Sequence, residues 1–79
     1  MSPTVFREKG YRFFFFSREE SRMHVHVAAS GGEAKYWLEP TVGLARNHRL
    51  TQVELNEVVD IIEARYDELT QAWRTHFSG

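Results

Sequence analysis

The sequence predicts an α+β fold, a two-layer sandwich in which a mainly antiparallel sheet of four to five strands packs on one long C-terminal helix. Two observations predict it. Residues 1–50 contain short alternating apolar segments separated by turns, a pattern typical of strands. Residues 51–77 instead carry apolar side chains at helical spacing, with no glycine or proline among them. Because the chain has only 79 residues, we expect a single domain spanning 1–79.

The strands are expected at about residues 3–7, 11–17, 23–29, 33–39 and, as an optional short fifth strand, 42–46. The second contains the run Phe13 to Phe16, which places aromatic rings on both faces and leaves open which pair is buried. The third and fourth alternate strictly, and Gly31-Gly32 between them suits a tight hairpin because glycine adopts positive φ easily. Pro40 ends the fourth strand.

The helix is predicted at about 52–77, preceded by a turn at Asn47-His48. Thr51 is the expected N-cap, and Glu54 completes a capping box with it. Its apolar stripe consists of Leu55, Val58, Val59, Ile62, Tyr66, Leu69, Trp73 and Phe77. Such a helix is roughly 40 Å long at 1.5 Å per residue. We therefore expect its last turns to extend past the sheet or to contact a partner.

Alternation assigns the side chains of the two central strands to opposite faces. The residues expected to face the helix are Val25, Val27, Ala34, Tyr36 and Leu38. Those expected on the other, open face are His24, His26, Lys35 and Trp37, together with one pair of phenylalanines. A contiguous exposed aromatic patch usually marks a binding surface. With one helix available to cover one face, the sequence predicts a partner, either a second copy of the chain or a different protein.

The formal net charge of -1 combines two unlike halves. Residues 1–50 contain eight Lys/Arg and five Asp/Glu, a sum of +3, and residues 51–79 contain two and six, a sum of -4. Cysteine is absent, which excludes disulfides, thiolate metal sites and cysteine nucleophiles. The sequence has no phosphate-binding glycine loop, no run long enough for a transmembrane helix and no signal peptide. We therefore expect a cytoplasmic protein with no membrane partner and no cofactor.

The candidate catalytic residues are His24 and His26. Two residues apart on a strand, their Cβ atoms lie about 6.5–7 Å apart on one face. Imidazoles so placed can act as a general acid and base, or ligate a metal ion with Glu33 or His48 as a third donor. A structural or interface role for both histidines is the competing interpretation.

Arg46, His48 and Arg49 precede the expected helix N-terminus, where free N–H groups favour anions. They could hold a phosphate there, although a turn that only caps the helix explains the same residues. Lys35, Trp37 and the exposed phenylalanines also resemble a nucleic-acid platform. The isoelectric point of about 6.4 and the lack of a basic run argue against that alternative.

Several blocks, in order, resemble the bacterial "domain of unknown function 4160" family. They are Gly10-Tyr11-Arg12-Phe13-Phe14-Phe15-Phe16-Ser17, His24-Val25-His26-Val27, Gly31 through Pro40, Leu44 through His48, and Glu68-Leu69-x-x-Ala72-Trp73. Family members usually have Pro-Pro before the histidine pair, where this chain has Arg22-Met23, and an Asp/Asn-rich loop where it has Glu19-Glu20. The resemblance implies a small prokaryotic protein, often encoded beside another small protein in a suspected toxin–antitoxin-type pair. It supplies no catalytic residue.

Three functions are compatible with these features. The first is an interaction protein of a toxin–antitoxin-like pair, or a homo-oligomer, that binds through Phe14, Phe16, His24, His26, Lys35, Trp37, Arg46 and His48. The second is a small RNA-acting toxin, a metal-independent ribonuclease with His24 and His26 as acid and base. The third is a metal-binding module with His24, His26 and Glu33 as ligands. We rank them in this order.

Overall fold

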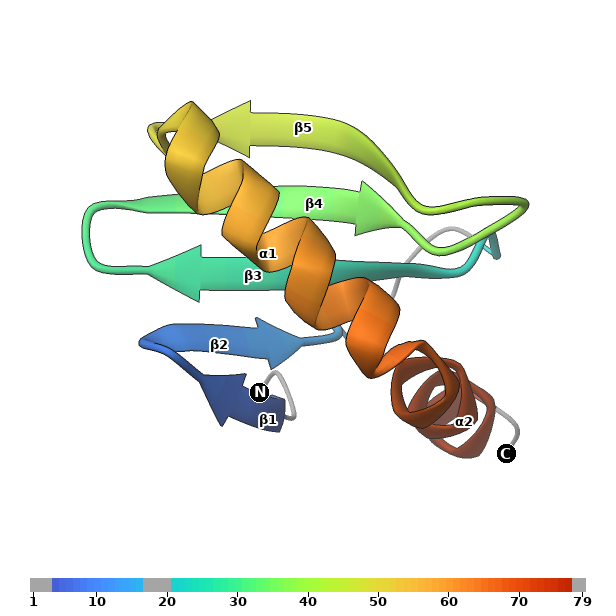
Figure 1. Cartoon of the computed structure of the whole chain (residues 1–79). Coiled ribbons are helices and arrows are strands. Elements are labelled where there is room, and N and C mark those ends of the chain that lie inside the picture. The colour runs from blue at the N-terminus through green and yellow to red at the C-terminus, as the bar shows by residue number, and fades with distance from the viewer. Residues whose placement is uncertain (1–3, 17–20, 78–79) are drawn as a thin grey trace.

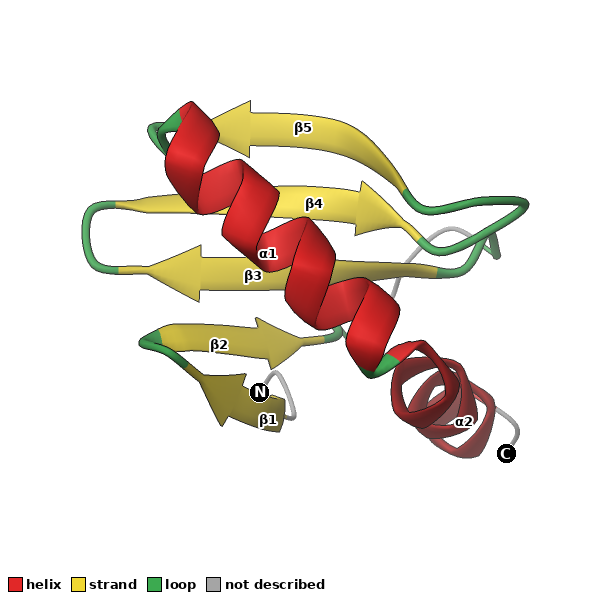
Figure 2. Cartoon of the chain, viewed as in Figure 1, coloured by secondary structure: helices red, strands yellow, loops and turns green. Residues whose placement is uncertain are grey.

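A computed structural model of the chain describes residues 4–16 and 21–77. Its elements are β1 (Thr4–Glu8), β2 (Tyr11–Phe14), β3 (His24–Ala29), β4 (Gly32–Trp37), β5 (Gly43–His48), α1 (Gln52–Ala64) and α2 (Tyr66–Phe77). The described strands form one antiparallel sheet in the order β1-β2-β3-β4-β5, and α1 crosses one face of it diagonally (Figure 1). Figure 2 shows the strands in one layer with α1 lying against it. The predicted α+β class and antiparallel sheet are confirmed.

The strands differ from the prediction mainly at their ends. The optional fifth strand is present and runs to His48, so the turn predicted at Asn47-His48 is wrong. β2 ends at Phe14, whereas the predicted end at residue 17 lies outside the described residues. In the β3–β4 turn Gly31 has φ +90°. Gly32 already belongs to β4, and a Cβ there would lie 2.7 Å from the carbonyl oxygen of His48.

The core lies between the sheet and the helices. All five residues predicted to face the helix are buried in it: Val25, Val27, Ala34, Tyr36 and Leu38. Phe13 and Phe15 also belong to this core, so they are the inward pair of the phenylalanine run. The hydroxyl of Tyr36 donates a hydrogen bond to the carbonyl oxygen of Leu55 (3.2 Å). This bond ties the centre of the sheet to α1.

The N-terminus of α1 is capped as the sequence predicts. The Glu54 amide donates to Thr51 Oγ1 (3.1 Å), and the Thr51 amide donates to Glu54 Oε1 (2.8 Å). Such a box satisfies two of the N–H groups that a helix start leaves without backbone partners. The predicted boundary between sheet and helix is therefore correct.

The prediction of one long helix is wrong, because the helix breaks at Arg65 and α2 runs in a different direction from α1 (Figure 1). Arg65 has φ -116° and ψ 27°, outside the helical region. A straight continuation would carry the apolar side chains of the last turns past the small sheet. The change of direction instead buries Leu69 and Trp73 in the core.

The side chain of Arg65 holds this break in place. Its guanidinium lies 3.5 Å from the centre of the Phe6 ring, and its Nη1 contacts Glu8 Oε1 at 2.9 Å. Two further nitrogens contact the Glu68 carboxylate at 2.8 and 3.0 Å. These contacts, led by the hydrogen bond to Glu68, raise the pKa of Arg65. One side chain thus connects β1, the break and the first turn of α2.

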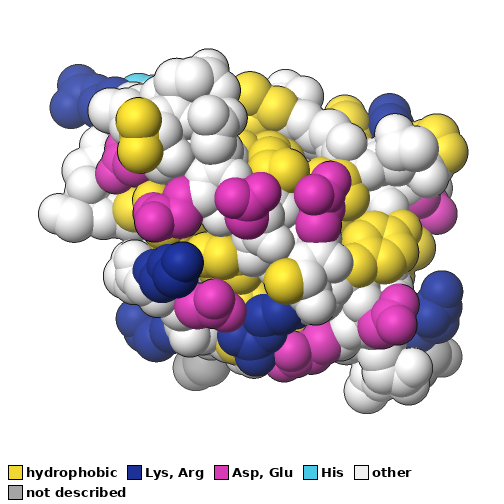
Figure 3. All heavy atoms as spheres, in the orientation of Figure 1, with side chains coloured by type: hydrophobic (Ala, Val, Ile, Leu, Met, Phe, Trp, Pro, Cys, Tyr) yellow, Lys and Arg dark blue, Asp and Glu magenta, His cyan; other side chains and the backbone are white. Residues whose placement is uncertain are grey.

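The helix layer is acidic, as the second half of the sequence suggests. Figure 3 shows acidic side chains in a row along the helix-bearing face. The acidic residues of the helices are exposed or half-buried: Glu54, Glu57, Asp60, Glu63, Asp67 and Glu68.

Neither described helix is long and apolar enough to cross a membrane.

Candidate functional site

The sheet face opposite α1, called the far face below, carries most of the predicted site residues. One cross-strand row consists of Phe14, His26, Lys35 and Arg46, which oppose one another on β2, β3, β4 and β5. Directly opposed residues of an antiparallel pair share a face. His24 and Trp37 form the next opposed pair on the same face. The predicted sharing of a face is therefore confirmed.

The expectation that this face is open is wrong for its centre. His24 is 0% exposed, His26 7% and Lys35 8%. The His24 ring lies edge to face with the indole of Trp73 (centroids 5.0 Å apart), and its Nδ1 is 2.6 Å from the carbonyl oxygen of Arg22. The break at Arg65 makes this contact possible, because it directs α2 to the end of the sheet where β3 begins.

Several aromatic rings of the far face are already covered by cations. The Arg12 guanidinium lies 4.4 Å from the centre of the Phe14 ring. Arg22 and Lys35 both lie over Trp37, at 4.0 and 4.6 Å. Such cation–π contacts occupy the ring faces that a nucleobase would need for stacking.

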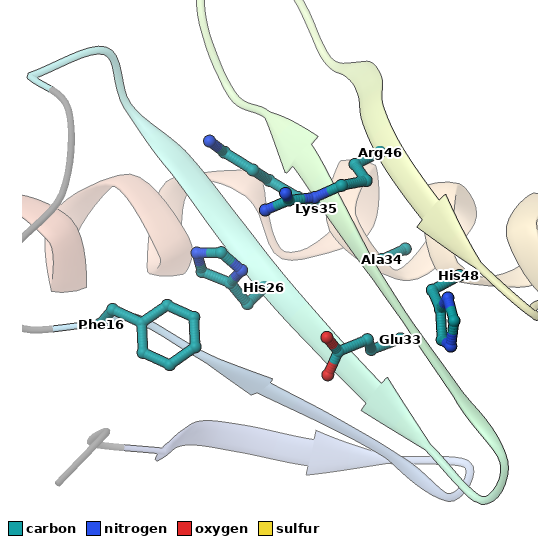
Figure 4. Close-up of a pocket in the computed structure, with 7 residues that line it drawn as sticks. All are labelled: Phe16, His26, Glu33, Ala34, Lys35, Arg46 and His48. Carbon is teal, nitrogen blue, oxygen red and sulfur yellow. The ribbon is translucent and has the colours of Figure 1, made fainter.

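An accessible pocket of about 480 Å³ remains on the far face (Figure 4). Its lining residues are Phe16, His26, Glu33, Ala34, Lys35, Arg46 and His48. The structure thus brings together five of the eight predicted binding residues: Phe16, His26, Lys35, Arg46 and His48. The other three, Phe14, His24 and Trp37, do not line it.

The pocket has a buried floor and an exposed rim. His26 and Lys35 are among the buried residues, whereas Glu33, Arg46 and His48 are exposed. Phe16, 43% exposed, lies edge to face with His26 at a centroid distance of 4.4 Å. Figure 4 shows Lys35 and Arg46 projecting over β4, with Glu33 further along this strand. The pocket therefore offers cations, imidazoles, one carboxylate and one aromatic ring.

The alternative of a phosphate site before the helix is not realised at the helix N-terminus. Arg46 and His48 lie in β5 and line the pocket, and Thr51 and Glu54 occupy the helix start. Asn47 closes the connection, because its side chain hydrogen-bonds both the amide and the carbonyl oxygen of Leu50 (3.0 and 3.1 Å). The predicted fifth strand ends at residue 46, and the prediction therefore missed that Arg46 and His48 lie on the same strand. Positions two apart on a strand share a face, so a strand extended to His48 would have placed both side chains together.

The proposed metal ligands do not assemble into a three-ligand group. The rings of His24 and His26 lie 5.3 Å apart, edge to face. Within the described ranges, no group of three or more His, Cys, Asp or Glu side chains is arranged to hold a metal ion. Glu33 lies instead at the rim of the pocket.

Comparison with known proteins gives one result. A family model described as "Domain of unknown function (DUF4160)" matches residues 10–74, which include the phenylalanine run, both histidines of β3 and most of α2. No curated protein and no solved structure matches the chain.

Proposed function

The chain belongs to the DUF4160 family, and from this premise we propose that it is the protein-interaction component of a toxin–antitoxin-like pair. The pocket on the far face is the proposed contact site for a small cognate protein encoded beside it. The observation that carries the proposal is the exposed ring of Phe16 at the rim of a pocket with a charged floor.

The composition of the rim supports a protein partner. Aromatic residues and arginine are enriched at protein interfaces, and both occur here as Phe16 and Arg46. Phe16 is one of three large hydrophobic residues that are well exposed in the described ranges; the others are Leu44 and Val53. Phe16 borders a pocket that also contains charged side chains. A partner that covers it would remove apolar surface from water.

The ribonuclease alternative has less support. His24 is buried against Trp73 and does not line the pocket, so His24 and His26 do not face a common space. This alternative predicts growth arrest on expression of the protein alone, and relief of the arrest in the His26→Ala variant. Harmless overexpression would count against it.

Co-purification with the neighbouring gene product tests the proposal. The chain and the neighbouring protein are co-expressed, and their affinity is measured by calorimetry. We expect Phe16→Ser to weaken association about tenfold or more, which is the range of a central interface residue. Val53→Ser is the matched control, because Val53 is 75% exposed on α1, on the other side of the sheet. Equal effects of the two substitutions, or no association at all, would contradict the proposal.

A further inference from the structure

We propose that the far-face pocket is a carboxylate-binding site, which accepts an acidic side chain from an extended segment of the protein partner. The inference rests on the proposed function for the nature of the partner, and it adds the chemistry by which the partner is recognised. It predicts that the recognised segment is rich in Asp or Glu.

The charge of the far face supports this proposal. Within the described strands, this face carries four cations and one carboxylate, namely Arg7, Arg12, Lys35, Arg46 and Glu33. The other strand carboxylate, Glu8, pairs with Arg65 next to the helices. The described strands therefore give this face a positive charge, although the whole chain has a net charge of -1.

The cross-strand pair Lys35 and Arg46 makes the pocket itself attractive to an anion. These two cations oppose each other directly on β4 and β5 and both line the pocket. An anion held between the two side chains would contact positive groups from both strands.

The remaining lining suits a carboxylate on an extended chain. The guanidinium of Arg46 can bind a carboxylate through two parallel hydrogen bonds. The imidazoles of His26 and His48 add polar groups from the strands on both sides of β4 (Figure 4). Phe16 supplies an apolar wall for the side chain's methylene groups.

The same features disfavour a nucleic-acid strand. Phe14 and Trp37 are covered by Arg12, Arg22 and Lys35 and are not open to bases. A carboxylate from a protein segment needs no open ring face on which to stack.

Titrations of the intact protein with three six-residue probes test the inference. The probes are hexaglutamate, its neutral counterpart hexaglutamine and hexauridylate RNA, each added at low ionic strength. Binding is followed by the NMR signal of the Trp37 indole N–H, because Lys35 Nζ lies 4.6 Å from that ring and responds to any anion that it binds. We expect hexaglutamate to shift the signal, hexaglutamine to leave it unchanged, and hexauridylate to bind several-fold more weakly.

Two arginine variants locate the site. Arg46→Gln should weaken hexaglutamate binding about tenfold or more, since it removes a charged hydrogen-bond donor. Arg7→Gln removes the same charge from the same face outside the pocket and should change the affinity less than twofold. Equal losses in both variants, no response to hexaglutamate, or equal or tighter binding of hexauridylate would overturn the inference.

Failure of this inference can be told apart from failure of the proposed function. If the neighbouring protein associates and Phe16→Ser weakens it, while hexaglutamate does not bind, the interface stands and the carboxylate chemistry is wrong. If hexaglutamate binds in an Arg46-dependent manner and no protein associates, the anion site stands and the proposed partner is wrong.

Discussion

The ring of His24 meets the indole of Trp73 edge to face, with ring centroids 5.0 Å apart. His24 is the first residue of β3 and Trp73 lies in α2, so the contact joins a central strand to the last helix. Trp73 also packs edge to face against Phe15 (5.4 Å). Through this cluster α2 closes the end of the sheet and removes His24 from the surface that can bind a ligand.

Replacement of Trp73 tests the importance of this closure. We expect Trp73→Ala to lower the free energy of unfolding by about 3–5 kcal/mol, the usual cost of truncating a buried tryptophan. Urea denaturation followed by circular dichroism measures the loss. Arg74→Ala, at the adjacent exposed position, is the control and should change stability little. If the alanine variant does not fold, Trp73→Phe should still fold with a smaller loss. If Trp73→Ala lowered the free energy of unfolding no more than Arg74→Ala does, the packing of Trp73 would not stabilise the end of the sheet.

The contacts of Arg65 predict a second effect. Lysine cannot bind the Glu68 carboxylate through two nitrogens while a third contacts Glu8, so Arg65→Lys should lower the free energy of unfolding measurably. Arg74→Lys makes the same change at an exposed position of α2 and should be neutral. High salt should reduce the difference between wild type and Arg65→Lys, because the ion pairs are partly exposed. Equal stability of the two variants would show that Arg65 does not hold the break.

Two glycines give a matched pair for the sheet. A Cβ at Gly32 would lie 2.7 Å from the carbonyl oxygen of His48, so Gly32→Ala should force β4 and the end of β5 apart. We expect a loss of about 1–3 kcal/mol, typical of overpacking. A Cβ at Gly43 meets nothing within 4 Å, and Gly43→Ala should be neutral or slightly stabilising. The midpoint temperatures of thermal unfolding measure both effects. Equal midpoints for the two variants would contradict the prediction.

The hydrogen bond from the Tyr11 hydroxyl to Glu57 Oε1 (2.8 Å) predicts an alkaline dependence of stability. Burial, then this bond, raises the pKa of Tyr11 from its ordinary value of 10.0 to about 12. The unfolded chain therefore releases this proton first as pH rises. The stability contributed by Tyr11 is fully present below pH 10.0 and is lost as pH approaches about 12.

Comparison of wild type with Tyr11→Phe isolates this contribution from other groups that titrate in the same range. Near neutral pH the variant should be less stable by about 1 kcal/mol, the net value of one hydrogen bond. Urea denaturation at several alkaline pH values should show this difference shrinking as pH rises. A difference that stays constant would exclude Tyr11 as the titrating group.

Local patterns in the sequence predicted much of this structure. Alternation assigned Val25 and Val27 to the core, because side chains on a strand point to opposite faces in turn. The pair Thr51 and Glu54 located the start of α1 through a bond pattern that spans one helical turn. For the site, alternation placed His26 and Lys35 on one face, although it overestimated how open that face is.

The sequence by itself determined the strands, their faces, the helix start and the separation of charge, because each depends on residues a few positions apart. Only the tertiary structure decided three further features. The break at Arg65 depends on contacts with Phe6 and Glu8 on β1, and the choice of Phe13 and Phe15 as the inward pair depends on pairing and on α2. The pocket depends on β5 reaching far enough to bring Arg46 and His48 beside β4. These contacts join residues that are distant in the sequence. Their energies depend on how deeply the side chains are buried and on how the strands pair, and neither can be predicted from a pattern of neighbouring residues.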